Sequence, residues 1–211
     1  LAQTLGIDVV DVIEYSPSAY DAEVIAARIA EDHPDFLWDV SYLDDGVAIW
    51  RAVLNAQIAL KGAIGTSSAF CMPAFGERLG PDAVGVYAAD KPDSNISAGA
   101  LSASGRTLLA EAKTAYGGDM EIPAVAGFVG GWTLFHDVLP FVKGATTADS
   151  IRTAALSVDV PAGDSINGGG VRFAGTGALD EGQNTRAAAV VGQWQAGDVM
   201  KVLYPPAYAQ A

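Results

Sequence analysis

Residues 35–70 constrain the fold of this chain more than any other stretch, because the patterns of a strand, a helix and a second strand follow one another directly. In 35–42 apolar side chains recur at every second position, which is the period of a β-strand. The polar turn 43–46 ends this run, and apolar residues then recur at helical spacing, at Val47, Trp50, Leu54 and Ile58. A second strand is predicted at 63–65, followed by the hydroxyl-bearing turn 66–68. A strand, a helix and a strand in this order are typical of a parallel sheet.

The ends of these two strands predict a ligand site. Neighbouring parallel strands direct the turns at their carboxyl ends towards the same crevice, where open α/β sheets bind ligands. Tyr42 follows the first strand and Ser67 follows the second. Asp44 and Asp45 open the intervening helix, where a carboxylate accepts hydrogen bonds from free amides and suits the positive helix end. We therefore predict a site near Tyr42 and Ser67, with Asp44 or Asp45 as a helix cap.

The flanking segments extend the same alternation over residues 1–88. The chain opens with what resembles the last turn of a helix ended by Gly6, so we expect it to start within an element, without an initiator Met or a signal peptide. The further predicted elements are a strand at 7–13, a helix at 22–32, a short helix at 73–80 and a strand at 84–87. Strands and helices that alternate in this way predict a parallel sheet flanked by helices.

After the polar, proline-containing segment 89–95 the pattern changes. Helices are predicted at 104–116, 123–139 and 147–156, the first capped by Ser104, and a turn at 167–170 leads to a strand at 171–173. Three glycines in the second helix, Gly127, Gly130 and Gly131, predict close packing or a close backbone approach there. Two final strands are predicted at 187–194 and 199–204. The apolar helices of this part need a partner, because the part lacks a sheet large enough to cover them.

Composition excludes several classes of function. With 12 basic against 25 acidic residues the net charge is −13, which argues against binding to nucleic acid or to anionic membranes. The single cysteine, Cys71, excludes an intramolecular disulfide and is predicted to be a small buried hydrophobe. No run approaches about 18 uninterrupted apolar residues, so no transmembrane helix is predicted. His33 and His136 lack metal-ligand spacing and no nucleophile motif occurs, so we predict no enzyme, no metal and no cofactor.

The order of these segments resembles a known family. Residues 37–88 are similar to the second lobe of type 1 periplasmic substrate-binding proteins, in the branch that serves branched-chain amino acid ABC transporters. The later segments follow in family order, as Gly127-Phe128-Val129-Gly130-Gly131-Trp132, Asp159-Val160-Pro161, Asn167-Gly168-Gly169-Gly170-Val171-Arg172-Phe173, Gly182-Gln183-Asn184 and Val191-Gly192-Gln193-Trp194. Each segment alone is weak evidence for the resemblance, but together the segments occur in family order over nearly the whole chain.

The resemblance implies an α/β fold with a Rossmann-like lobe, a parallel sheet flanked by helices, together with helices and a hairpin of an incomplete first lobe. It assigns 1–89 to the second lobe, 90–185 to the incomplete first lobe, and 186–211 to a crossover strand, the terminal strand of the second lobe and a tail. In this family two lobes close on the ligand by a hinge motion. The first segment of the first lobe, which carries the export signal, has no counterpart in this sequence, so we expect a fragment of such a protein.

The resemblance also implies four ligand-binding residues, Tyr42, Ser67, Ser68 and Phe128. Tyr42 matches a ligand-facing aromatic residue, with a strand-end tyrosine that caps the core as the alternative. Ser67 matches an acidic residue that leucine-type binders use for the ligand's amino group, and Asp44 or Asp45 could replace it. Ser67 and Ser68 could equally be ordinary turn hydroxyls. Phe128 matches an aromatic residue that lines the cleft, with a core aromatic as the alternative.

The function implied by the resemblance is that of the solute-binding component of an ABC importer in the periplasm. Its ligand would be an amino acid or a related small amide-type solute, and its partner a membrane permease that receives the closed form. Two alternatives stay open. One is a ligand-sensing regulatory domain of the same fold. The other is a folded fragment that binds nothing and self-associates through the surface left by the missing lobe.

Overall fold

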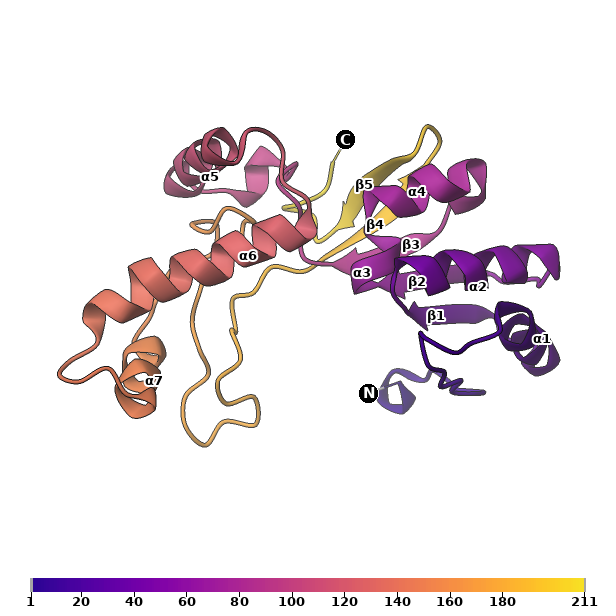
Figure 1. The fold of residues 1–211 in the computed structure, drawn as a ribbon, viewed down its shortest axis with the longest axis horizontal. Helices are drawn as coiled ribbons and strands as arrows, with labels where there is room; N and C mark the ends of the chain where they lie inside the picture. Colours follow the sequence, from indigo (N-terminus) through magenta and orange to yellow (C-terminus); the bar gives the residue numbers. More distant parts are fainter. Residues whose placement is uncertain (1, 211) are drawn as a thin grey trace. The chain divides into compact units, whose positions relative to one another are not determined.

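The computed structural model describes residues 2–210, apart from the side chains of Gln3, Ser67 and Ser68. The chain forms two compact units, which are drawn in Figure 1 and described here one at a time. The first unit runs to Asp90 and includes Val191–Lys201, and the second comprises Lys91–Val190 and the segment from Val202. The predicted assignment of 1–89, 90–185 and 186–211 to lobes remains a prediction.

A five-stranded sheet organises the first unit, and it confirms the predicted α/β fold. The strands lie in the order β1 (Phe36–Val40), β2 (Gly62–Thr66), β3 (Tyr87–Asp90), β4 (Val190–Gln195) and β5 (Val199–Tyr204). The first three are parallel, with Val40 opposite Thr66 and Ile64 opposite Tyr87. The carboxyl ends of β1 and β2 therefore lie at the same edge of the sheet, as residues 35–70 predict.

The helices predicted at 22–32 and 73–80 begin at the predicted residues, whereas the polar turn predicted at 43–46 is instead the first turn of a helix. The helices of this unit are α1 (Ala22–Asp32), α2 (Leu43–Asn55), α3 (Ser67–Phe70) and α4 (Pro73–Leu79), preceded by the short turn η1 (Gln3–Leu5) and followed by η2 (Gly80–Ala83). Asp21 caps α1 by accepting hydrogen bonds from the amides of Glu23 and Val24. The predicted turn 66–68 is instead the start of α3, because the chain enters a helix directly after β2.

Aromatic side chains form the centre of the core of the first unit. The ring of Phe75 lies between those of Phe70 and Trp194, with centroid separations of 4.4 and 6.1 Å. The indole nitrogen of Trp194 donates to the backbone oxygen of Phe70 at 2.8 Å. Gly65 makes this packing possible, since a β-carbon there would lie 1.8 Å from the Phe70 ring. Cys71 is buried beside this core, in agreement with its prediction.

The face of β1 that is buried is not the one that the alternation of its apolar residues predicts. Trp38 and Val40 are 68% and 71% exposed, and Phe36 on the same face is also exposed. The buried side chain of the strand is the polar Asp39. The alternation therefore predicts the strand correctly, but the apolar stripe has little cover within the described residues.

The predicted strand at 7–13 is wrong. Its residues follow η1 and the left-handed Gly6 without joining the sheet, whose edge is β1. Ile7, Val9, Val10 and Val12 are exposed. A strand requires a ladder of hydrogen bonds to a neighbour, and a run of β-branched apolar residues does not supply that neighbour.

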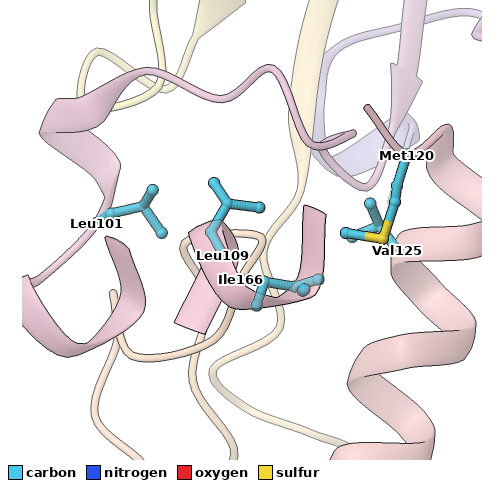
Figure 2. Close-up of a cluster of buried hydrophobic side chains, with 6 residues drawn as sticks. Leu101, Leu109, Met120, Val125 and Ile166 are labelled. Atoms are coloured by element: carbon cyan, nitrogen blue, oxygen red, sulfur yellow. The ribbon is translucent and has the colours of Figure 1, made fainter. Parts of the chain in front are cut away.

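The second unit is built from helices. They are η3 (Ala98–Ala100), α5 (Ala103–Tyr116), α6 (Ile122–Trp132), the π-helical segment η4 (Thr133–Val138), η5 (Leu139–Phe141) and α7 (Ala148–Leu156). One cluster of buried side chains joins α5, α6 and the loop near 166, through Leu101, Leu109, Met120, Val125 and Ile166 (Figure 2). A second, smaller cluster contains Val138, Ala154, Val158 and Val171.

Three local predictions in the second unit are wrong. Ser102, not Ser104, caps α5, accepting from the amide of Gly105 at 3.1 Å. The glycines of α6 do not mark close packing, since a β-carbon at Gly127, Gly130 or Gly131 would meet nothing within 4 Å. The predicted strand at 171–173 is instead a pair of isolated β-bridges, from Val160 to Val171 and from Phe173 to Asn184. Each bridge joins single residues and does not extend into a ladder.

The helical run Ile122–Phe141 is the one segment of the described residues that is long and apolar enough to cross a membrane, by length and composition alone. Its mean hydropathy is 1.3, and 11% of the tested window is buried in the structure. A search for about 18 uninterrupted apolar residues does not find this segment, because His136 and Asp137 interrupt it. The same composition also suits a helix that packs against further protein.

Candidate functional site

A cavity of about 550 Å³ lies in the first unit, at the carboxyl end of β1. Its wall combines the loop before α1 with the end of β1 and the start of α2, through Ile13, Tyr15, Val40, Ser41, Tyr42 and Asp45. The predicted site residue Tyr42 is therefore at a cavity. This is the edge of a parallel sheet at which the sequence predicts ligand binding.

Tyr42 connects β1 to α2 and presents its ring at the surface. Its backbone is extended, with φ −88° and ψ 176°, and the next residue begins the helix. The side chain makes no capping hydrogen bond and is 64% exposed. An exposed phenol at the mouth of a cavity can pack on an apolar group and also form a hydrogen bond.

The two acidic residues at the start of α2 have separate partners, and neither is a helix cap. Asp44 forms an ion pair with Arg78 at 2.5 Å and has an exposed side chain. Asp45 is only 2% exposed and accepts a hydrogen bond from the hydroxyl of Tyr15 at 2.6 Å. Tyr42 takes the capping position instead, without a side-chain bond, so the predicted capping role is wrong. Both carboxylates still lie in the first turn, where the helix dipole favours negative charge.

Asp39 and Ser41 place more buried polar groups next to Asp45. Burial raises the pKa of Asp39 to about 6, and the nearby charge of Asp45 adds to the rise while the Ser41 hydroxyl opposes it. Burial and the hydrogen bond to Asp45 raise the pKa of Tyr15 above its usual value. Ser41 is 9% exposed, and its hydroxyl interacts with both Asp39 and Tyr15. The end of β1 therefore holds a buried acidic cluster.

Ser67 and Ser68 are placed by their backbone alone. They open α3 directly after β2, and β2 is the parallel neighbour of β1. Their side chains lie outside the described part of the structure, so their ligand contacts remain a prediction.

Phe128 lies in α6 of the second unit. It is half-buried against the cluster around Val125 and stacks on Trp132, with ring centroids 5.7 Å apart and planes 12° apart. Trp132 in turn stacks on His136 at 4.5 Å. These contacts suit an aromatic residue of a core, and the predicted ligand contact of Phe128 remains a prediction.

The described residues contain no group of three or more His, Cys, Asp or Glu side chains that could hold a metal ion. His33 ends α1 in a left-handed conformation, with φ 47°, and His136 bonds to Asp137 at 2.8 Å.

Sequence reasoning missed Tyr15, Asp39 and Ser41. Two signals point to them in retrospect. Tyr15 begins the loop that follows the apolar segment 7–13, and Asp39 is a charged residue inside an otherwise apolar strand. A buried charge in a strand is unusual unless it is paired or functional.

Comparison with known proteins supports the resemblance, although no known protein-family profile matches the chain. Over 207 residues the chain is 27% identical to Leu/Ile/Val-binding protein homolog 8 of Brucella abortus (strain 2308), covering 97% of this chain and 49% of that protein. Homologs of the same name from Brucella suis and Brucella melitensis match equally. The chain thus spans about half the length of these curated relatives.

Solved structures share the fold. A branched-chain amino acid ABC transporter protein from Thermus thermophilus, with bound valine, superposes with a TM-score of 0.67 at 15% identity, over 100% of this chain and 55% of that one. A leucine-binding protein from Thermotoga maritima gives 0.66 at 14% identity, over 87% and 47%. A leucine-, isoleucine-, valine-, threonine- and alanine-binding protein from Brucella ovis gives 0.64 at 18% identity, over 99% and 50%.

The names of these relatives describe binding proteins and transporter components, not enzymes. The predicted resemblance is therefore confirmed. The chain has the fold of the type 1 periplasmic binding proteins of branched-chain amino acid ABC transporters and is similar, over nearly its whole length, to about half of such a protein.

Proposed function

We propose that this chain is the solute-binding part of an ABC importer and that it binds an amino acid or a related small amide-type solute. The observation that carries the proposal is the cavity at the carboxyl end of β1, in a fold whose solved relatives include a valine complex. Parallel α/β sheets bind ligands at this edge. The proposal assigns the site to residues that the sequence also singles out.

In this proposal Tyr42 packs its ring on the apolar part of the solute. The exposed phenol at the cavity mouth has the area and the polar end for that role. Ser67 and Ser68, which follow the neighbouring strand β2, would offer hydroxyls to the solute, and Phe128 in α6 would be a further aromatic ligand contact. Binding would favour a closed form through the higher affinity of that form for the solute. A membrane permease would then receive the solute, in the periplasm.

A second candidate is self-association without solute binding. The observation that favours it is the exposed apolar surface, which includes the Trp38 and Val40 face of β1 and the run Ile122–Phe141. Apolar surface of this kind marks interaction sites. A sensing role for the same fold would need the same cavity, and a signalling partner in place of a permease.

Isothermal titration of the chain with a panel of branched-chain amino acids, small polar amino acids and their amides tests the first candidate. We expect binding of at least one member, weakened by about tenfold in Tyr42→Ala because a packed aromatic ring contributes about 1 kcal/mol or more. Leu203→Ala, far along the chain on β5, is the control and should bind as the unchanged chain does.

Absence of binding to every member would contradict the importer role. Analytical ultracentrifugation of the same samples addresses self-association. A concentration-dependent dimer supports that candidate, and a monomer at all concentrations contradicts it.

A further inference from the structure

The second unit contains a polar cavity of about 460 Å³ that the proposed function does not use. Its lining comes from α5, from the helical run through α6 and η4, and from the loop that follows α7. α5 contributes Glu111, the helical run contributes Trp132 and His136, and the loop contributes Asp164 and Ser165. A cavity of this size can hold a small molecule.

Two carboxylates line this cavity without a cation beside them. Asp164 accepts hydrogen bonds at Oδ1 from the hydroxyls of Ser102 at 2.5 Å and Ser104 at 2.8 Å, and its Oδ2 has no partner among the described residues. These bonds hold the pKa of Asp164 below its usual value, so the group is ionised at neutral pH. Glu111 is exposed on α5 and forms no ion pair within the described part of the chain.

The basic side chains of α5 are engaged elsewhere. Arg106 donates to a backbone oxygen at 2.7 Å, and Lys113 pairs with Asp119 at 2.7 Å. None of the described lining residues is Lys or Arg, and the imidazole of His136 is bonded to Asp137 at 2.8 Å. The charge of the cavity wall is therefore complementary to a cation from outside the chain.

Ser165 is a second and independent sign that the wall receives a ligand. The residue is only 9% exposed and lines the same cavity. Its backbone is satisfied within its own loop, because the amide donates to Gly169 at 3.0 Å and the carbonyl accepts from Gly168 at 2.9 Å. Its hydroxyl has no hydrogen-bond partner among the described residues. Buried hydroxyls are normally hydrogen-bonded, so an unpaired one at a cavity wall indicates a ligand position.

We propose that this cavity binds a small molecule with a guanidinium group, which Asp164, Glu111 and Ser165 hold. A guanidinium carries one positive charge, five N–H donors and no acceptor. It can therefore bond at the same time to oxygens that come from α5 and from the loop. The two carboxylates compensate its charge, and hydrogen bonds between charged groups are the strong ones.

The aromatic wall of the cavity favours a guanidinium over an ammonium. Trp132 and His136 stack with ring centroids 4.5 Å apart and planes 20° apart. A planar guanidinium stacks on such rings, whereas an ammonium is a compact and strongly hydrated charge. Leu108 and Val160 also line the cavity and offer contact to the apolar part of the ligand. The site lies wholly in the second unit and does not depend on the proposed function.

The test uses the full chain, labelled with nitrogen-15, and three probes that share a butyl group. n-Butylguanidinium has a planar cation, n-butylammonium has a tetrahedral cation, and pentanamide has a planar neutral group. Dissociation constants come from NMR chemical-shift titrations, which also show where each probe binds. The titrations are run at about pH 8, where an ordinary imidazole is uncharged. Circular dichroism establishes that each variant is folded.

Asp164→Asn removes a charge but keeps an oxygen that can accept from Ser102 and Ser104. We expect it to weaken the binding of n-butylguanidinium by about 10- to 100-fold, the range for a hydrogen bond between charged groups. Ser165→Ala should weaken this binding by about tenfold, because it removes one acceptor of a charged group. Glu121→Gln is the matched control, since it removes an exposed carboxylate of the same unit outside the cavity lining. It should change the binding by no more than about twofold.

We expect n-butylguanidinium to bind more tightly than n-butylammonium, to shift the amide signals around Ser165, and pentanamide not to bind measurably. Equal binding of the two cations overturns the guanidinium class. The site itself is overturned by absence of binding, by shifts confined to the first unit, or by binding that persists in both Asp164→Asn and Ser165→Ala. If Asp164→Asn fails to fold, Glu111→Gln takes its place, with an expected loss of about fivefold for a more exposed charge.

Discussion

The two compact units bury their apolar surface in different ways. In the first unit a sheet gives the helices a shared surface, and Phe70, Phe75 and Trp194 pack in its centre. In the second unit the helices form two small clusters, and the run Ile122–Phe141 remains largely unburied. A sheet thus supplies the neighbours that isolated helices lack, because each of its strands offers a continuous face to the helix that follows it.

The two units also differ in the side chains that line their cavities. The one in the first unit is lined by Asp45, Tyr15 and Ser41, and it sits at fixed strand ends. The second unit has one cavity of about 460 Å³ that is lined mainly by apolar side chains of α6, η4 and α7, including Val129, Leu134 and Ile151. Another cavity of about 460 Å³ in this unit has a more polar lining, which includes Glu111 and His136. Polar groups held by a sheet suit a small charged ligand. An apolar groove between helices suits further protein.

The largest expected effect concerns the tight core of the first unit. Gly65→Ala places a methyl group 1.8 Å from the Phe70 ring, so the ring or the strand must shift. We expect a loss of about 3 kcal/mol in the free energy of unfolding, measured by urea denaturation with tryptophan fluorescence. Gly127→Ala in the second unit meets nothing within 4 Å and is the control. An equal loss in both variants would show that the two units are packed alike.

The next effect concerns the buried carboxylate of β1. The pKa of Asp39 in the folded chain, about 6, lies above its ordinary value of 3.8. Between these values the folded chain holds a proton that the unfolded chain has released, so stability falls as pH rises from about 4 to about 6. Below this window the group has no effect, and above it the charged form costs about 2 to 3 kcal/mol.

Asp39→Asn removes this cost. We expect the variant to be more stable than the unchanged chain at neutral pH by about 2 kcal/mol and equal to it near pH 4, in urea titrations at both values. Asp35→Asn, an exposed carboxylate just before the same strand, should keep the pH slope of the unchanged chain. A variant Asp39→Asn with an unaltered slope would show that Asp39 is solvated like a surface residue.

The smallest effect concerns the exposed helix of the second unit. Gly130 has a helical backbone and free space around it, so Gly130→Ala removes backbone freedom from the unfolded chain without a clash. We expect a gain of about 0.5 to 1 kcal/mol, measured by thermal unfolding. Gly76→Ala on α4 is the matched control, because a β-carbon there would lie 2.4 Å from Trp194. A loss of stability in Gly130→Ala would mean that α6 is packed against protein at that position.

Much of the fold could be predicted from local pattern. The residues 35–70 contain the period of a strand, of a helix and of a second strand, and β1, α2 and β2 form there. Helix ends were predictable where a residue type enforces them, as at His33 before Pro34 and at Thr147, which caps α7. The segment 7–13 is rich in Val and Ile, as a strand is, but it has no partner strand, and local pattern contains no information about partners.

The site was predictable only in part. Tyr42 follows from its position after a strand, but Tyr15 reaches Asp45 across thirty positions of the chain. Only folding brings these two residues together. The roles of Asp44 and Asp45 also differ for a tertiary reason. They are neighbours on the same helix turn, yet one faces Arg78 at the surface and the other faces Tyr15 in a cavity.

By itself, the sequence determined the α/β class, the parallel pair of strands and the place of the cavity, because these follow from hydrophobic period and chain order. The tertiary structure decided which face of β1 is buried, which carboxylate is withdrawn from solvent and which hydroxyls lie beside it. These properties depend on neighbours that are distant in sequence. The electrostatics of a buried group are set by those neighbours and not by the residue itself.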